Sequence, residues 1–311
     1  MHPDRLAHTM KYPFHLVDVF TDRPLAGNQL AVVLDADGLE PSRMQAVARE
    51  FNFSETTFVT PSAAEGCDWR VRIFTPVEEL PMAGHPTIGT AVVLHALGRV
   101  SERTVFELGV GPTPVRVGPG WAEMDQRPAS FGAEHHDPAA LAAALSIPHE
   151  ELTEAGLPVQ SASSGVPYLI VPIRSLAAMR RLRPRPDDLR ATLATFPGTA
   201  VYCVSTQVER PGWDAHCRMF APHLGVAEDP ATGSAAGPLG CYLATHLPAQ
   251  GDGTRRTRRF RFEQGIEMGR PSLIEVTVER AGDAGGTLTA VRVAGEAHRF
   301  AEGWLTLDTQ T

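Results

Sequence analysis

Lysine is almost absent from this chain of 311 residues. Lys11 is the only lysine, and the other basic residues, histidine aside, are all arginine. A P-loop needs a lysine on the phosphates, and a pyridoxal phosphate enzyme needs one for its Schiff base. The sequence also lacks a GxSxG elbow, an HExxH zinc motif and a GxGxxG fingerprint after a strand. These absences exclude several large classes of enzyme.

Cysteine and long apolar runs are scarce as well. The four cysteines are Cys67, Cys203, Cys217 and Cys241. They are widely spaced and form no CxxC pair, which is typical of a reduced cytosolic protein with buried thiols. No run reaches 18 apolar residues, and residues 1–10 lack a signal-peptide core. We therefore expect a cytoplasmic protein with no membrane partner, whose natural start is Met1 or Met10.

Positive charge is not concentrated enough to favour nucleic acid as a partner. The net charge is −8, and 21% of the residues are charged, as in ordinary globular proteins. The one arginine-rich segment, RRTRRFRF (255–262), alternates with aromatic residues. That pattern is typical of an exposed strand edge, so we expect no nucleic-acid surface.

Two apolar helices are predicted, one in each half of the chain. Segment 86–98 is apolar nearly all round, starts with proline and stops at Gly98, so it should be buried. A second such helix is expected near 232–246, and an amphipathic helix at 41–51. Strands are expected at 15–20, 29–34, 55–60, 69–74, 166–173, 200–205, 215–220, 259–264, 273–279 and 288–295.

The two halves repeat the same order of elements. IFTP (73–76) matches MFAP (219–222), and HPTIGTA (85–91) matches DPATGSA (229–235). Each half therefore reads strand, FxP turn, glycine-rich bend and buried helix, which predicts a duplicated α+β unit with one central helix per half. Chance similarity between two helix starts is the alternative. The polar segment 127–136 is the predicted linker.

Glu55 is the first candidate for chemistry. It lies among phenylalanines in FNFSETTFV. In an apolar pocket, desolvation would raise the pKa of its carboxyl toward neutrality and suit it to take and give a proton. The neighbouring Ser54 could orient it. The alternative is a solvated residue at the edge of a strand.

His85 and Asp229 each lie at the start of a predicted buried helix. The positive end of the helix dipole disfavours imidazolium, so we expect His85 to be neutral near pH 7. Both residues could instead be simple helix caps. After Asp229, the segment 232–234 offers the N–H groups and hydroxyls of Thr232, Gly233 and Ser234 at a helix N-terminus, which is an anion site. Two such termini facing each other would bind a small carboxylate.

A metal site is not expected. His135, His136 and Asp137 are adjacent in the sequence, but adjacent side chains in a predicted linker rarely converge on one ion.

Five motifs together make the chain similar to a known family. They are DVFTDRPLAGNQLAVVL (18–34), NFSETTFV (52–59), RIFTP…ELPMAGHPTIGTA (72–91), EDPATGSAAG (228–237) and EQGIEMGRPS (263–272). In this order, from about residue 12 to the C-terminus, they resemble the PhzF family of phenazine-biosynthesis-type isomerases. The resemblance implies the α+β fold of diaminopimelate epimerase, in which two pseudo-symmetric domains each wrap a mostly antiparallel sheet around a central helix.

The resemblance also implies boundaries and a function. The domains would be 1–128 and 129–311, with about 298–311 packing back onto the first. The activity would be cofactor-free proton transfer, similar to that of trans-2,3-dihydro-3-hydroxyanthranilate isomerase, in a homodimer. The shuttling glutamate corresponds to Glu55, with His85 and Asp229 beside it. The residues that correspond to substrate contacts are Ser54, Gly84, Gly233 and Ser234, with Asn28 a weaker candidate for the wall of the cleft.

The missing cysteines separate this chain from the epimerase branch of that fold, which needs one thiol in each glycine-rich bend. The bends here, MAGHP and DPATGS, contain none, so a two-thiol racemase is disfavoured. Two alternatives stay open: an isomerase acting on another small amino or hydroxy acid, and a non-catalytic ligand-binding protein on the same scaffold.

Overall fold

The computed structural model describes residues 9–135, 138–194, 200–222, 225–248, 256–282 and 286–308. The first half contains β1 (Thr9–Val19), β2 (Asn28–Val33), α1 (Pro41–Phe51), β3 (Glu55–Pro61), β4 (Trp69–Phe74), β5 (Glu79–Leu80), α2 (Gly84–Ala96), β6 (Arg103–Leu108), β7 (Gly111–Gly118) and β8 (Trp121–Gln126). The second half contains β9 (Ser130–His135), α3 (Pro138–Leu145), α4 (Glu150–Thr153), β10 (Val159–Ser163), β11 (Pro167–Pro172), α5 (Leu176–Arg181), α6 (Pro186–Leu193), β12 (Ala200–Ser205), β13 (Ala215–Ala221), β14 (Val226–Asp229), α7 (Gly233–His246), β15 (Thr257–Gln264), β16 (Ser272–Arg280) and β17 (Leu288–Asp308).

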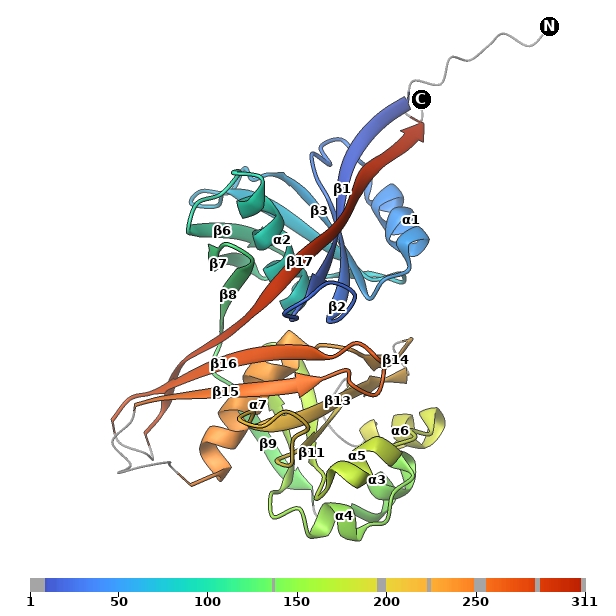
Figure 1. The fold of residues 1–311 in the computed structure, drawn as a ribbon, viewed down its shortest axis with the longest axis vertical. Helices are drawn as coiled ribbons and strands as arrows, with labels where there is room; N and C mark the ends of the chain where they lie inside the picture. The colour runs from blue at the N-terminus through green and yellow to red at the C-terminus, as the bar shows by residue number, and fades with distance from the viewer. Residues whose placement is uncertain are drawn as a thin grey trace, which may run out of the picture.

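Helix α2 lies inside the first half, against β1, β2, β3, β7, β8 and β17 (Figure 1). Its residues 84–94 are all buried, as the apolar pattern predicts. The helix begins two residues before the expected start and ends at Ala96. Gly98 has a positive φ of 67°, and it and Arg99 donate backbone hydrogen bonds to His95 and Leu94. Gly98 therefore stops the helix as expected, in a Schellman arrangement.

Helix α7 occupies the equivalent place in the second half, against β10, β11, β15, β16 and β17 (Figure 1). It is almost wholly buried, with Pro238 in its interior. Its start at Gly233 lies within one residue of the prediction. Small residues let the sheet approach: a Cβ on Gly240 would lie 2.6 Å from Val276 Cγ1. The helices α3 to α6 pack in a separate cluster below this sheet (Figure 1).

The last strand, β17, connects the two halves. Its first part pairs antiparallel with β16 and with β8, and residues 297–308 then pair antiparallel with β1. In Figure 1 it runs from the lower half to the top of the molecule beside β1. The strand predicted at 288–295 is therefore part of a longer one, because β1 offers a free edge to the residues that follow.

The predicted linker at 127–136 is wrong for residues 130–135. These form β9, which pairs antiparallel with β10. Glycine and polar residues suggested a loop, but the edge of β10 supplies backbone hydrogen bonds that outweigh local preference. The other strands overlap the ranges predicted for them, and α1 has the predicted bounds. No helix in the described ranges is long and apolar enough to cross a membrane.

Truncation of a central-helix side chain should destabilise the protein strongly. Leu239 in α7 is 0% exposed, whereas Leu25 is 73% exposed. We expect Leu239→Ala to lower the free energy of unfolding by about 2–5 kcal/mol, because it leaves a cavity in close-packed core. Leu25→Ala should change it by less than about 0.5 kcal/mol. Urea denaturation of both variants tests this, and equal effects would contradict the assignment of α7 to the core.

Candidate active site

The two central helices meet at their N-termini. A Cβ on Gly84, the first residue of α2, would lie 3.0 Å from the Cα and carbonyl carbon of Gly233 and from the nitrogen of Ser234. Glycine at position 84 therefore permits this approach, whereas a Cβ on Gly233 would instead lie 2.9 Å from the Phe20 ring. The first N–H groups of a helix have no partner within it, and helix N-termini carry partial positive charge. The expected pair of facing termini is therefore present.

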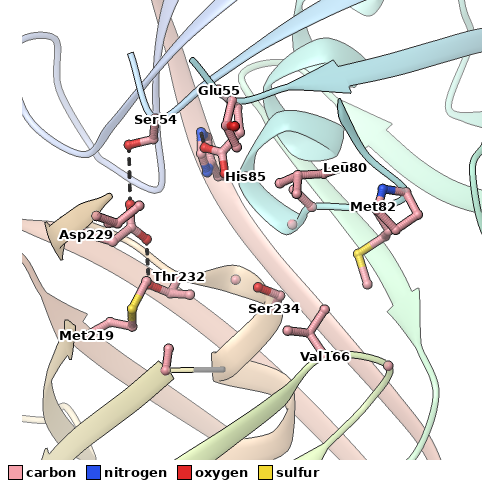
Figure 2. A pocket seen from close by; sticks show the side chains of 18 of the residues that line it. Ser54, Glu55, Leu80, Met82, His85, Val166, Met219, Asp229, Thr232 and Ser234 are labelled. Carbon is pink, nitrogen blue, oxygen red and sulfur yellow. Dashed lines mark hydrogen bonds and ion pairs between the residues drawn. The ribbon is translucent and has the colours of Figure 1, made fainter. Parts of the chain in front are cut away.

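A cavity of about 930 Å³ opens beside this meeting point. The sequence-predicted residues in its wall are Ser54, Glu55, Gly84, His85, Asp229, Thr232, Gly233 and Ser234. Figure 2 shows the polar groups on one side and an apolar wall on the other. That wall includes Leu80, Met82 and Val166, whereas Met219 lies on the side of Asp229 and Thr232. Among the residues that the structure describes, the only basic side chain in the wall besides His85 is the exposed Arg127.

Glu55 and His85 form a close pair (Figure 2). Glu55 begins β3, and its Oε2 lies 3.3 Å from His85 Nε2. The Glu55 side chain is 16% exposed, and neither of these two atoms has a hydrogen-bond partner among the described residues. Burial, and then the charge of Asp229, raise the pKa of Glu55 well above its ordinary value. Burial lowers the pKa of His85 to about 3. At neutral pH His85 is therefore a neutral imidazole, and it lies beside a carboxyl that holds its proton more tightly than an exposed glutamate does.

His85 does not cap its helix. The N-cap position of α2 is Ala83, without a side-chain cap, and His85 is the second helical residue. The cap interpretation is therefore wrong. The expected neutrality of the ring is present, but its main cause is burial rather than the helix dipole alone.

Asp229, at the end of β14, is the ionised partner in this site. It accepts hydrogen bonds from the Thr232 hydroxyl (2.5 Å), Asn28 Nδ2 (2.8 Å) and the Ser54 hydroxyl (3.4 Å). Burial raises its pKa to about 6, although these three donors lower it. At pH 7, Asp229 is therefore ionised in most molecules. The N-cap of α7 is Thr232, so the prediction of Asp229 as the capping residue is wrong: two residues separate them.

Asn28 lies behind the cavity and not in its wall. It is 1% exposed, and its Nδ2 donates to Asp229 Oδ1 and to the carbonyl of Ala231, 3.2 Å from His85 Nδ1. Because both acceptors are oxygen atoms, the NH₂ group of the Asn28 amide, and not its carbonyl oxygen, must face them. The expectation that Asn28 lines the cleft is therefore wrong. It joins the first half of the chain to the turn that carries Asp229.

Three contributing residues were missed in the sequence. The Tyr168 hydroxyl lies 2.7 Å from Ser234 Oγ, and burial raises the pKa of Tyr168, so the phenol keeps its proton. Gln126 donates to the carbonyl of Gly233 (3.0 Å), and Gln264 donates to the carbonyl of Asp229 (2.8 Å). Tyr168 and Gln126 lie in ordinary strands with no motif. Gln264 had a signal, its place in the EQGIEMGRPS motif.

A metal centre has no support in the described part of the chain. No group of three or more His, Cys, Asp and Glu side chains there could hold an ion. Of the candidate set at 135–137, residues 136 and 137 lie outside the described ranges.

The buried carboxyl predicts a stability that falls as pH rises. Glu55 has a folded-state pKa above its ordinary value of 4.5. Its bound proton therefore stabilises the fold fully below pH 4.5, and this contribution is lost as pH rises toward the folded-state pKa. Gln does not ionise, so Glu55→Gln should gain stability relative to wild type as pH rises above 4.5, by up to about 1.4 kcal/mol per pH unit, until the folded-state pKa of Glu55 is reached.

Urea denaturation at several pH values measures this difference. Glu65→Gln, at an exposed position, is the matched control and should change stability little at any pH. A Glu55→Gln difference that does not vary with pH would contradict the burial of a protonated carboxyl.

Comparison with known proteins agrees with this geometry. The family model described as "Phenazine biosynthesis-like protein" (PhzC-PhzF) matches residues 17–303. An uncharacterized isomerase of Mesorhizobium japonicum is 40% identical, with 93% of this chain and 97% of that protein covered. A trans-2,3-dihydro-3-hydroxyanthranilate isomerase of Pseudomonas aeruginosa is 39% identical, with the same coverage.

Solved structures give the same assignment. A PhzF-family phenazine biosynthesis protein of Bacillus anthracis superposes with a TM-score of 0.86 at 28% identity, covering 95% of this chain and 99% of that one. A probable proline racemase of Agrobacterium radiobacter has a TM-score of 0.63 at 11% identity, covering 96% and 93%, and shares the fold alone. The chain belongs to the PhzC-PhzF family of phenazine biosynthesis-like proteins and is an isomerase.

Proposed function

We propose that this isomerase moves a proton within a small carboxylate substrate without a cofactor, as in the isomerisation of trans-2,3-dihydro-3-hydroxyanthranilate. One observation carries the proposal. Glu55, whose carboxyl has a raised pKa, and a neutral His85 lie 3.3 Å apart in a cavity that also holds a mostly ionised Asp229. A carboxyl with a raised pKa is suited both to take and to give a proton, which acid–base catalysis requires.

The substrate carboxylate binds where the helices meet. Gly84, Gly233 and Ser234 present the N-terminal ends of α2 and α7 to the cavity, and Ser234 adds a hydroxyl. Partial positive charge from two termini favours an anion here. The single exposed arginine at the wall is not needed for this contact. The rest of the substrate lies against the apolar wall.

Glu55 carries the proton. In its ionised form it abstracts a proton from an activated carbon, and the electron pair moves into the conjugated system of the substrate. The same carboxyl then returns a proton at another carbon, so that the product is an isomer. Its raised pKa strengthens it as a base and keeps the proton bound until it is returned. His85 and Asp229 stabilise the charge that develops between the two steps.

We propose further that the two halves act as pseudo-symmetric domains, 1–128 and 129–311, each contributing one wall of the site. The antiparallel return of β17 onto β1 supports the packing of the C-terminal residues on the first domain. The homodimer and the cytoplasmic location stay predictions from the sequence.

A different small amino or hydroxy acid is the alternative substrate. The volume of about 930 Å³ is near the upper end of the range for small-molecule sites. It leaves room for a substrate larger than a single ring, handled by the same Glu55. A non-catalytic binding protein would not need a carboxyl of raised pKa beside a neutral histidine.

Substitution of Glu55 tests the proposal. Glu55→Gln keeps the shape of the side chain but cannot take a proton, so kcat should fall by about 10²–10⁴-fold or more. Substrate affinity, measured by calorimetry, should stay within about threefold, because the carboxylate is bound by the helix termini. Glu78→Gln changes another glutamate in the cavity wall and should leave kcat nearly unchanged.

The assay uses trans-2,3-dihydro-3-hydroxyanthranilate first and then other small amino and hydroxy acids. An active Glu55→Gln enzyme would overturn the role of Glu55. A wild-type protein that binds these acids but converts none would favour the binding alternative.

A further inference from the structure

The motif EQGIEMGRPS (263–272) has no part in the proposed chemistry, yet one of its side chains lies directly behind the site. Gln264 is the last residue of β15 and is 0% exposed. It is packed against the turn that runs from Asp229 to Thr232. A fully buried amide needs partners for all of its hydrogen-bonding groups, so its contacts define what it does.

All four contacts of the Gln264 amide are made within this region. Its Oε1 accepts from the Thr232 N–H (3.2 Å) and from the Tyr202 hydroxyl (3.0 Å). Its Nε2 donates to the carbonyl of Asp229 (2.8 Å) and to Thr232 Oγ1 (3.0 Å). A backbone N–H can only donate and a backbone carbonyl can only accept, so the orientation of the amide is fixed by its partners.

This orientation determines where the Thr232 hydroxyl proton goes. Thr232 Oγ1 accepts a hydrogen from Gln264, and its own single hydrogen is directed to Asp229 Oδ2 at 2.5 Å. The hydrogen bonds from Tyr202 through Gln264 and Thr232 therefore all point toward the same carboxylate. Donors aligned in this way favour the charged form of a carboxyl group.

We propose that Gln264 is a positioning residue, which directs the Thr232 hydroxyl onto Asp229 and so favours the ionised carboxylate. In this role Gln264 does not contact the cavity. It acts through the Thr232 hydroxyl, so the motif EQGIEMGRPS helps to keep Asp229 ionised beside Glu55 and His85.

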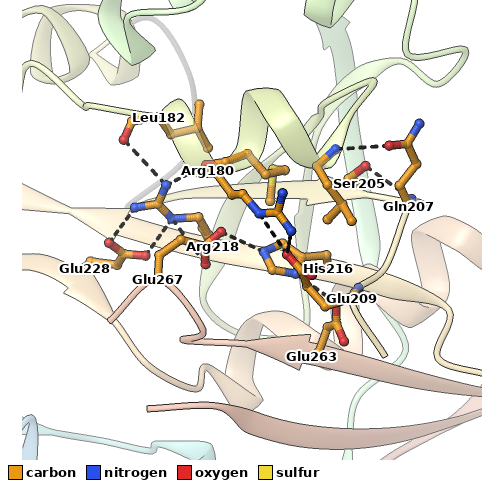
Figure 3. A network of polar contacts seen from close by, with 12 residues as sticks. Arg180, Leu182, Ser205, Gln207, Glu209, His216, Arg218, Glu228, Glu263 and Glu267 are labelled. Atoms are coloured by element: carbon orange, nitrogen blue, oxygen red, sulfur yellow. Dashed lines mark hydrogen bonds and ion pairs between the residues drawn. The ribbon is translucent and has the colours of Figure 1, made fainter. Parts of the chain in front are cut away.

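The neighbours of Gln264 hold it in place. Glu263 points to the opposite face of β15, where it accepts from His216 Nδ1 (2.9 Å) and from the backbone N–H of Glu209 (Figure 3). Although burial opposes charge on His216, its bonds to Glu263 and Glu267 raise its pKa to about 9, so it is a cation between two carboxylates. Strand β15 is therefore anchored at the residue before Gln264.

The residues after Gln264 reach both halves of the chain. Gly265 has a φ of +73°, and a Cβ there would lie 2.6 Å from the carbonyl oxygen of Pro230. Arg270 donates to the carbonyls of Ala26 and Gly27 (both 2.7 Å) and pairs with Asp18. Gly27 precedes Asn28, the other buried donor to Asp229. The motif thus positions the donors on two sides of this carboxylate.

Other ionisable groups also face Asp229, and none of them is substituted in the variants used for the test. They are Glu55 on β3, His85 on α2, Glu228 on β14, Tyr168 on β11 and Tyr202 on β12. The charge of Glu228 raises the pKa of Asp229, and the charge of Asp229 raises that of Glu55.

The test is a ¹³C NMR titration of full-length protein labelled at the aspartate carboxyl carbon, with the Asp229 signal assigned from Asp229→Asn. Gln264→Met has a similar shape but no donor, and we expect it to raise the pKa of Asp229 by about half a unit or more. Thr232→Val should also raise it. In the Thr232→Val background, Gln264→Met should add less than half of the shift it causes alone.

Two further variants make the result decisive. Gln160→Met makes the same exchange in β10, where Gln160 donates to the carbonyl of Gly132, and should not move the Asp229 titration. If Gln264→Met fails to fold by circular dichroism, Gln264→Asn is used instead: its amide is uncharged but one methylene shorter, so it withdraws the donor from Thr232 and should also raise the pKa by about half a unit or more. A rise in the Asp229 pKa of less than half a unit would overturn the proposal. So would a Gln264→Met shift that is as large in the Thr232→Val background as in the wild type. The titration uses no substrate, so it is independent of whether the proposed reaction is correct.

Discussion

The contact between Gly84 and Gly233 is the constraint on which the rest of the site depends. Two buried helices, one from each half of the chain, begin at the same point, and a single methyl group on Gly84 would meet backbone atoms at 3.0 Å. This contact places Glu55 and His85 from the first half next to Asp229 and Ser234 from the second. It also brings two helix N-termini to one cavity, and their partial positive charge is why the site suits an anion.

Burial around this contact sets the charge of each group. Glu55 Oε2 and His85 Nε2 lack hydrogen-bond partners among the described residues, so desolvation raises the pKa of Glu55 and lowers that of His85. Asp229 is also buried but receives three hydrogen bonds, and its pKa rises to about 6. The hydrogen-bond donors around each carboxyl group in this cavity therefore decide how far burial raises its pKa. Two of the donors to Asp229, Ser54 and Thr232, lie in the cavity wall, and the third, Asn28, lies behind it.

Periodicity and repeats predicted what depends on local sequence. The buried helices and the paired glycine-rich bends follow from patterns of a few residues, and the resemblance to the PhzF family added substrate contacts such as Gly84. The place of Asn28 could not be predicted, because it depends on how the two halves pack. Strand β9 was missed because its stability comes from the edge of β10. The strands β6 to β8 and helices α3 to α6 carry no motif, and Tyr168 reaches Ser234 only through the tertiary fold.

The central claim is that Glu55 transfers a proton between carbons of the substrate in this cavity. Incubation of the enzyme with substrate in D₂O, followed by mass spectrometry and NMR of the recovered compounds, tests it most directly. The account predicts deuterium in the product at the carbon that gains a hydrogen, and none when Glu55→Gln replaces the wild type. Substrate that wild-type enzyme leaves unlabelled and unconverted, or equal labelling by the two proteins, would contradict it.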